Sequence, residues 1–330
     1  MMERFSIRHR LFFKFLNQYV VALFLGSLII GFSIISHSFL NAENLLFLIT
    51  HNSPLIIMAV GLSFIMVGGG IDLSLGYQIS LCSVVMGYLL ANDAHPLVAM
   101  AMAVLTGVAC GALNAAVIIS LNIPPFAATL ATQFIFRAVA NTISSGRAYT
   151  RLPQIGNWNV LKPLLGITTH TWIALLCLLL YGLIFSLTPF GTYVKALGEN
   201  ESAVKRIGIR VNRVKFVSYI IGSFFFAIQA IILTFLNGVA SPSTGIGMEI
   251  IAITVVFLGC NSLLRNESTN IISPMFHLGL GVMILAVLEN GMLLAGWSVN
   301  AQLLVRGFVL IFAITLYYRR KINLPHAEDS

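Results

Sequence analysis

The chain has 330 residues, of which 58% are hydrophobic and only 9% are charged, and its formal net charge is +8. A soluble domain carries about 25% charged residues, so this chain has too few to cover a water-facing surface. The positive charge does not indicate nucleic acid binding, because the basic residues cluster at both ends and in one loop between apolar runs, as membrane topology signals do.

Apolar segments follow one another along the chain, and most have about 18–25 residues, the helix length that crosses a hydrocarbon core of about 30 Å. They lack the period-2 alternation of a transmembrane β-barrel. We therefore predict an all-α membrane protein, a polytopic bundle of about ten transmembrane helices, some broken or re-entrant. The predicted segments are 16–36, 45–68, 74–91, 97–120, 125–144, 170–187, 215–237, 249–262, 271–292 and 298–317.

Two boundaries stay open. The second and third segments are separated only by residues 68–72, so they are either two spans or one broken helix. The eighth, over 249–262, is short for a full crossing. No polar stretch is long enough to bury a core of its own. We expect one transmembrane domain over 1–330, which divides into a first helix set (15–187), a cytoplasmic loop (188–214), a second helix set (215–318) and a cytoplasmic tail (319–330).

The distribution of basic residues predicts the orientation. With the N-terminus inside, 14 of the 19 Lys and Arg fall on the cytoplasmic side, Arg147, Arg151 and Lys162 fall outside, and Arg137 and Arg306 lie within segments. This excess follows the positive-inside rule and places both termini in the cytoplasm.

The stretch Met66–Gly76, MVGGGIDLSLG, is the most informative. Three consecutive glycines weaken a helix by about 1 kcal/mol each relative to alanine. Asp72 is suited to cap the next helix by accepting from the amide of Ser74 or Leu75. A broken helix with a carboxylate at its junction can line a substrate path in a transporter. A plain tight turn at the membrane surface, with Asp72 only as its cap, fits the residues equally well.

Charged residues at membrane depth are costly, about 2.5–3.5 kcal/mol each at a helix centre, and suggest function. We expect structural roles for Glu289 and Arg306, and Glu249 and Glu289 are compatible with segment ends in water. Arg137 either pairs with an acid across the bundle or extends toward the outer surface. Asp72, described above, is the fifth charged residue of this group.

Three stretches, in order and spacing, resemble the ribose/xylose/arabinose/galactose-type permeases of ABC transporters. Together they cover the chain from about 45 to 235. They are Gly69–Gly76 (GGIDLSLG), Ile123–Leu130 (IPPFAATL) with Phe136-Arg137 downstream, and Phe190–Glu201 (FGTYVKALGENE) followed by Ala203 and Gly208-Ile209. The likeness weakens at residues 259–267, where the family's glycines are missing.

The resemblance implies the permease subunit of an importer for a sugar or similar small polar solute, in a bacterial inner membrane. Its implied partners are a cytoplasmic ATPase, a periplasmic or extracellular solute-binding protein, and a second permease, identical or related. This chain would bind no cofactor, with ATP and Mg on the ATPase, and it would not be an enzyme. Accordingly, it contains no GxxxxGK[ST] or HExxH motif. The alternative is an ion-gradient-driven secondary transporter with Asp72 as its coupling carboxylate.

The resemblance also points to an ATPase-coupling loop. Its residues predict a short helix over about 201–207, capped by Glu199 or Asn200 and ended by Gly208. Ala203, Val204 and Ile207 would form its apolar face, with Lys205 and Arg206 off it. The helix would dock in a cleft on the ATPase, or else lie on the bilayer. The candidate coupling residues are Gly198, Glu199, Asn200, Ala203, Ile207 and Gly208.

The candidate residues of the translocation path or helix break are Gly69, Gly70, Asp72, Ser74, Pro125, Phe126 and Thr129. Phe126 would offer a stacking face to a sugar, although such residues more often start and pack a helix. The four cysteines, at 82, 110, 177 and 260, lack metal-ligand spacing and are expected to be small buried hydrophobes. His51, His95 and His170 share no spacing and are expected to be solvated, so no metal site is predicted.

Overall fold

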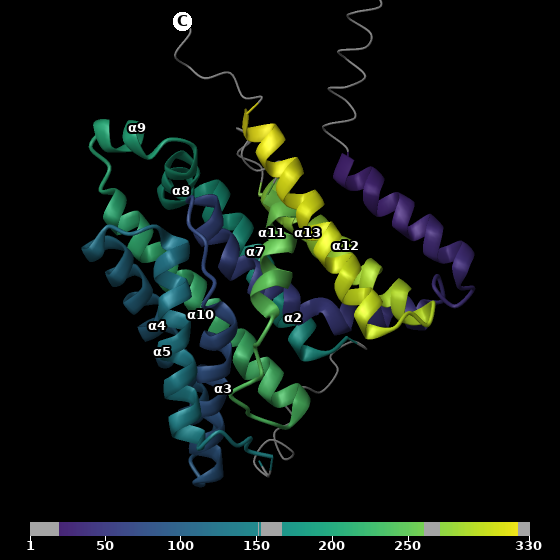
Figure 1. Cartoon of the computed structure of the whole chain (residues 1–330), viewed down its shortest axis with the longest axis horizontal. Helices are drawn as coiled ribbons and strands as arrows, with labels where there is room; N and C mark the ends of the chain where they lie inside the picture. Colours follow the sequence, from purple (N-terminus) through teal and green to yellow (C-terminus); the bar gives the residue numbers. More distant parts are fainter. Residues whose placement is uncertain (1–19, 151, 153–166, 261–270, 323–330) are drawn as a thin grey trace, which may run out of the picture.

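The computed structural model describes residues 20–150, 152, 167–260 and 271–322 (Figure 1). Over these residues the all-α prediction is confirmed, since they form helices joined by turns, without a β-strand. The helices are Val20–Ile35, α2 (Ala42–Val67), α3 (Leu75–Ala91), α4 (Pro96–Leu121), α5 (Pro125–Ser144), α7 (Thr169–Leu187), α8 (Pro189–Glu199), α9 (Glu201–Arg206), α10 (Val211–Asn237), α11 (Met248–Cys260), α12 (Ile272–Leu294) and α13 (Val299–Ile322).

A helix lies on each predicted segment. Among the described residues, six helices are long and apolar enough to cross a membrane, namely α2, α4, α7, α10, α12 and α13. The helix Val20–Ile35, α3 and α11 are shorter apolar helices. The chain is thus a multi-pass membrane protein, while the number of ten crossings stays a prediction.

Local sequence explains several helix ends. Pro96 and Pro125 stand at the first position of α4 and α5, where the missing amide hydrogen has no helical partner to lose. Asn122 adopts a left-handed conformation that ends α4, and Pro124 follows it. α2 continues through Pro54.

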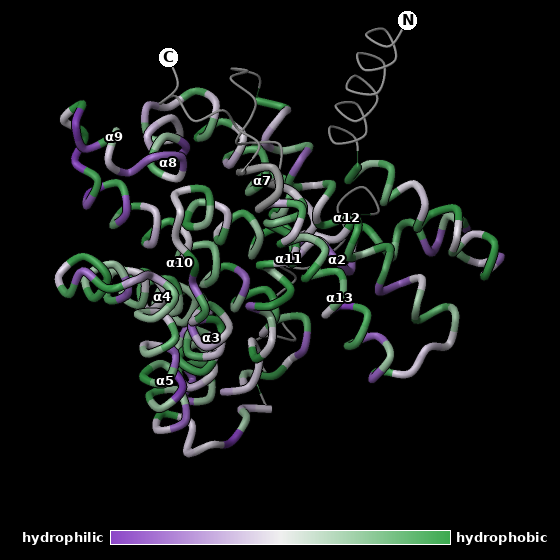
Figure 2. Tube along the Cα trace, turned by 45° about the horizontal axis from the view of Figure 1, so that its top comes forward, coloured by the Kyte–Doolittle hydropathy of each residue, from purple (hydrophilic) through white to green (hydrophobic). Residues whose placement is uncertain are grey.

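α2 and α10 form the centre of the bundle. α2 packs against α7, α10, α11 and α12, while α10 also packs against α3 and α4. Glycines bring these helices together: a Cβ at Gly61 would lie 2.7 Å from the carbonyl oxygen of Gly222, and one at Gly111 would lie 2.5 Å from that of Tyr219. Small residues allow such close approach of helices in membranes. Figure 2 shows hydrophobic residues along most helices and hydrophilic ones in and around α9.

The segment 238–247, between α10 and α11, runs back along α3. Ala240 forms an isolated backbone bridge with Tyr149 and packs against Gly87, late in α3. Gly245 then contacts Gly76, in the first turn of α3. α11 consequently begins beside the start of α3, and its 13 residues span about 20 Å. Because the described residues end at Cys260 here, an incomplete crossing of the eighth segment stays a prediction.

Candidate functional site

The glycine-rich stretch breaks the chain between α2 and α3. Gly69 has a φ of +84°, a left-handed conformation that favours glycine. Asp72 is fully buried, and its Oδ1 accepts hydrogen bonds from the amide and the hydroxyl of Ser74, at 2.8 and 2.6 Å. The predicted acceptance of the Ser74 amide is confirmed. Gly70 lies close to α10, where a Cβ would stand 2.9 Å from the hydroxyl of Tyr219.

The other carboxylate oxygen of Asp72 joins the break to α3 and α4. Oδ2 accepts from Nε2 of Gln78 at 2.9 Å and from Nδ2 of Asn114 at 3.2 Å. The same two amides also donate to Oγ of Ser74. The amide oxygen of Asn114 in turn accepts from the hydroxyl of Thr132 in α5. Hydrogen bonds from four neutral groups thus satisfy a carboxylate that would be costly to bury alone.

Thr129 ties α5 to the same break. Its hydroxyl oxygen accepts from the amide of Leu73 at 3.1 Å and lies 3.0 and 3.2 Å from the carbonyl oxygens of Pro125 and Ile71. Thr129 is fully buried, whereas Phe126, one turn earlier in α5, is 53% exposed. The predicted path residues therefore divide into a closed polar cluster around Asp72 and an exposed aromatic ring.

Arg137, whose role the sequence left open, is exposed on α5. Its Cζ lies 5.9 Å from the ring centroid of Tyr77 in α3, within the range of a cation–π contact.

The predicted coupling loop contains two helices. α8, expected to be loop, begins at Pro189 with the Thr188 hydroxyl accepting from the amide of Gly191 at 3.2 Å. α9 covers the predicted short helix, and Asn200 caps it by accepting from the amide of Ala203 at 2.9 Å. Gly208 follows with a φ of +83°, which ends the helix as predicted.

The predicted apolar face of α9 is wrong in one residue. Val204 is only 3% exposed and turns into the protein, whereas Ala203 is exposed and Ile207 is 73% exposed. The reason is that α9 is itself packed onto the bundle through Val204, so the apolar residues that face outward are Ala203 and Ile207.

An ion-pair cluster fixes α9 to α10. Glu201 lies 2.9 Å from the ammonium group of Lys205 and 2.8 Å from that of Lys215 in α10. Burial raises the pKa of Glu201, but hydrogen bonds from Lys215 and Lys205 outweigh it and hold the pKa below its usual 4.5.

The coupling loop and the helix break are in direct contact. A Cβ at Gly198, near the end of α8, would overlap the carbonyl oxygen of Val67 and lie 3.4 Å from the amide nitrogen of Gly69. Val67 is the last residue of α2. The two regions, which the sequence singled out separately, therefore meet through backbone atoms.

The remaining charged candidates are not in open water. Arg306 Nη2 lies 3.1 Å from Glu289 Oε1, and both side chains are about a quarter to a third exposed. This ion pair agrees with the structural roles expected of them. Glu249 is partly buried in the first turn of α11, beside Gly76. The sequence left open whether the two glutamates stand at segment ends in water, and the structure places both in partly buried positions, Glu289 beside Arg306 and Glu249 beside Gly76.

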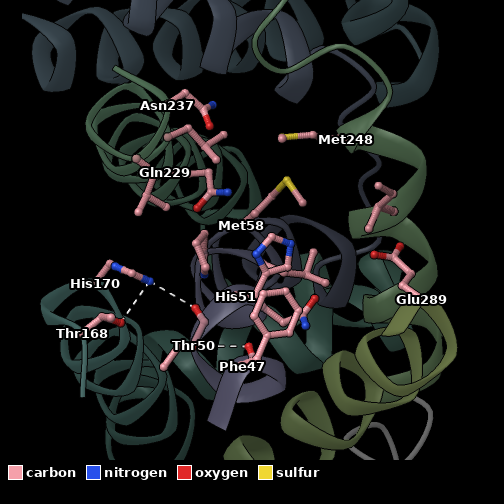
Figure 3. Close-up of a pocket in the computed structure, with 16 residues that line it drawn as sticks. Phe47, Thr50, His51, Met58, Thr168, His170, Gln229, Asn237, Met248 and Glu289 are labelled. Atoms are coloured by element: carbon pink, nitrogen blue, oxygen red, sulfur yellow. Dashed lines mark hydrogen bonds between the residues drawn. The ribbon is translucent and has the colours of Figure 1, made fainter. Parts of the chain in front are cut away.

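A cavity of about 500 Å³ lies among α2, α7, α10, α11 and α12, and the sequence did not predict it (Figure 3). It opens among the start of α2 and α7 and the end of α10, and it reaches inward to Met58 and Met248. By chain direction this is the end of the bundle away from α8 and α9. Its polar lining includes His51, His170 and Gln229.

The prediction that the three histidines are solvated does not hold for all of them. His51 is exposed and stacks on Phe47, with ring centroids 4.8 Å apart. His95 accepts from the amide of Leu97 at the start of α4. His170 is only 5% exposed, so its predicted solvation is wrong: it packs against α2, with Nε2 3.1 Å from the carbonyl oxygen of Thr50. No group of metal-ligating residues gathers in the described part of the chain.

The cysteine side chains that the structure describes, those of Cys82, Cys110 and Cys177, are buried as predicted. The stretch at 261–267, which departs from the resemblance, lies outside the described residues, as do the basic N-terminus and the end of the tail.

Comparison with known proteins agrees with the resemblance. The family described as "Branched-chain amino acid transport system / permease component" matches residues 44–314. The ribose import permease protein of Escherichia coli (strain K12) is 30% identical over 286 residues, 86% of this chain and 88% of the relative. That of Bacillus subtilis (strain 168) is 32% identical over 291 residues, 88% and 89%. The L-arabinose transport system permease protein of Escherichia coli (strain K12) is 30% identical over 263 residues, 78% and 77%.

No solved structure matches the chain. The family match spans most of the chain, and the relatives above align over more than three quarters of their own lengths. The chain therefore belongs to the family of ABC-transporter permease components that includes the ribose and L-arabinose permeases.

Proposed function

We propose that this chain is the membrane-spanning permease subunit of an ATP-driven importer that carries a sugar or similar small polar solute across a bacterial inner membrane. The observation that carries the proposal is the match over 44–314, together with relatives of nearly full length that are named as ribose and L-arabinose permeases. The family description mentions amino acids, but these relatives favour a sugar.

In this proposal both termini lie in the cytoplasm, and residues 319–330 form a cytoplasmic tail. The loop 188–214 also lies in the cytoplasm and joins the first helix set (15–187) to the second (215–318). The basic residues in and around α9 support the orientation by the positive-inside rule. The partners are a cytoplasmic ATPase that holds ATP and Mg, an external solute-binding protein and a second permease. No cofactor is assigned to this chain, and it has no catalytic role of its own.

We assign ATPase docking to α8 and α9. The outward residues Ala203 and Ile207 suit a small apolar cleft, and Asn200 and Gly208 set the ends of the helix that presents them. Glu199 lies at the end of α8, beside that cap. The contact of Gly198 with Val67 would pass a displacement of α8 directly to the break at Gly69 and Gly70.

We assign Asp72, Ser74 and Thr129 to holding this break in one conformation rather than to touching solute, because their polar atoms bond to one another and to their neighbours. In the secondary-transporter alternative the carboxylate of Asp72 would exchange a proton or sodium with the path. We disfavour it because four donated hydrogen bonds occupy this carboxylate and Asp72 does not line the cavity. Pro125 starts α5. Gly69 and Phe126 are the exposed residues among the predicted path residues, and Phe126 is the only one of the two with a side chain.

The test is purification of the tagged chain in mild detergent, identification of co-purifying proteins by mass spectrometry, and reconstitution with them in vesicles. We expect an ATPase to co-purify and labelled D-ribose or L-arabinose to accumulate only with ATP. Replacing Ile207 and Ala203 by glutamate should release the ATPase and leave the permease in the membrane. Accumulation driven by an ion gradient in vesicles that hold this chain alone would contradict the proposal.

A further inference from the structure

The cavity near the starts of α2 and α7 is open at one end, and residues of a single chain line it. Its volume, about 500 Å³, falls in the range of about 300–1,000 Å³ that small-molecule sites occupy. In Figure 3, Gln229 of α10 and Glu289 of α12 lie on opposite sides, with Met58 and the ring of His51 between them in this view. The cavity is separate from the polar cluster around Asp72, since none of that cluster's residues lines it.

Unpaired polar atoms belong to the residues that line the cavity. Oε1 of Gln229 and Nδ1 of His170 have no hydrogen-bond partner among the described residues, and Oε1 of Glu289 has only its ion pair with Arg306. Gln229 is 2% exposed and lines the cavity, yet its Oε1 has no hydrogen-bond partner among the described residues. Buried polar atoms are paired in the large majority of cases, so an unpaired one that borders a cavity indicates a missing donor. A hydroxyl of a bound solute, or a water that it displaces, would supply it.

The charges in the wall are balanced. Glu289 is the one carboxylate among the described lining residues, and Arg306 forms an ion pair with it at 3.1 Å. No lysine or arginine appears among the described residues that line the cavity. An amino acid would bring both a carboxylate and an ammonium group, and each would lose its hydration without an opposite charge free to receive it.

The apolar part of the wall suits one face of a sugar ring. Phe47 and His51 stack with an interplanar angle of 12° and form a flat edge, while Met58 and Met248 close the inner end. Thioether side chains adapt to irregular shapes. A pyranose or furanose has such a combination of surfaces, with apolar C–H faces and a rim of hydroxyls.

We propose that this cavity is a solute-binding site within the single permease chain, that it accepts neutral polyhydroxylated solutes of monosaccharide size and rejects zwitterionic amino acids, and that Gln229 is one of its hydrogen-bonding residues. This inference rests on the proposed transport of a small polar solute and names where and by what chemistry the permease itself recognises it.

The test uses the full chain in lipid nanodiscs without its partners. Asn237, exposed at the rim, is changed to cysteine, and its modification by a methanethiosulfonate reagent is followed by peptide mass spectrometry, so the native cysteines can stay. The probes are D-ribose, L-arabinose and D-galactose, compared with L-leucine and D-ribose 5-phosphate, each titrated toward its solubility limit. Asn92→Cys, exposed at the end of α3 and outside the cavity, is the control for labelling.

We expect at least one neutral sugar to slow the labelling of Asn237→Cys, and we expect neither L-leucine nor D-ribose 5-phosphate to do so. No probe should slow the labelling of Asn92→Cys. Gln229→Leu should raise the half-protecting sugar concentration about two- to tenfold, the value of one hydrogen bond. Gln302→Leu, the same change outside the cavity, should not raise it. If Gln229→Leu fails to fold, His51→Phe at an exposed position keeps the stacking and removes the ring nitrogens, and it should raise the concentration likewise.

The proposal is overturned if no sugar protects, if L-leucine protects as well as the sugars do, or if both Gln229→Leu and His51→Phe leave protection unchanged. These outcomes are separable from failure of the proposed function. ATP-driven sugar uptake by the reconstituted complex with no protection at 237 would refute only the site. Protection by sugar in a chain that recruits no ATPase would refute only the importer.

Discussion

Replacing Gly198 by alanine tests the contact between the coupling loop and the helix break. The added Cβ would overlap the carbonyl oxygen of Val67 and stand 3.0 Å from its carbonyl carbon, and both belong to the backbone at the end of α2, so neither can rotate away. Overpacking of this kind costs about 1–3 kcal/mol. Because alanine favours helix over glycine by about 1 kcal/mol, we expect a net loss of up to about 2 kcal/mol in the free energy of unfolding.

The matched control is Gly307→Ala in α13, where a Cβ would meet no atom within 4 Å and the backbone needs no positive φ. We expect this variant to be as stable as the wild type or slightly more so. Unfolding in detergent, followed by tryptophan fluorescence, measures both, and ATP-driven uptake per ATP hydrolysed measures coupling. If Gly198→Ala matches Gly307→Ala in both measurements, the contact does not constrain the permease and the route from α8 to the break is refuted.

Three further predictions follow from named contacts. Asp72→Asn places an amide donor against either the Ser74 donors or the side-chain amides of α3 and α4, so we expect it to lower the unfolding midpoint and uptake. Asp329→Asn, in the predicted cytoplasmic tail, should change neither. Because the pKa of Glu201 is lowered in the folded state, its ion pair stabilises the fold fully above pH 4.5, and this stabilisation is lost as the pH falls through the folded-state pKa. Glu201→Gln should therefore lower the unfolding midpoint at pH 7, and on acidification its midpoint should fall less than that of the wild type. Lys215→Met should weaken ATPase recruitment less than Ile207→Glu in a pull-down, because the first loosens α9 and the second blocks its outward face.

Sequence reasoning succeeded where the cause is local. Asp72 accepts from an amide two residues ahead, and Asn200 accepts from one three residues ahead, so spacing alone predicts both contacts. Val204 shows the limit of this approach. The periodicity of α9 placed it beside Ile207, but packing against the bundle, which depends on residues far away in sequence, decides which apolar residue is buried.

The return of 238–247 along α3 could not be predicted for the same reason. Its glycines and serines have the composition of a surface turn, and only the complementary small residues at Gly76 and Gly87 make room for it inside the bundle. The position of the start of α11 beside α3 depends on that path, so it could not be predicted either.

Side-chain amides within apolar helices were an available signal that the sequence analysis did not use. Gln78, Asn114 and Gln229 all stand in helices whose other residues are mostly apolar, and a polar side chain in such a setting calls for a partner. The first two donate to Asp72 and complete a closed cluster. The third borders a cavity and keeps an unpaired oxygen. The same chemistry therefore meets two different surroundings. Gln78 and Asn114 hold the break in place through the hydrogen bonds that they donate, although Oε1 of Gln78 is also unpaired among the described residues. Of the three, only Gln229 borders the cavity, so its unpaired oxygen is the one that a solute can reach.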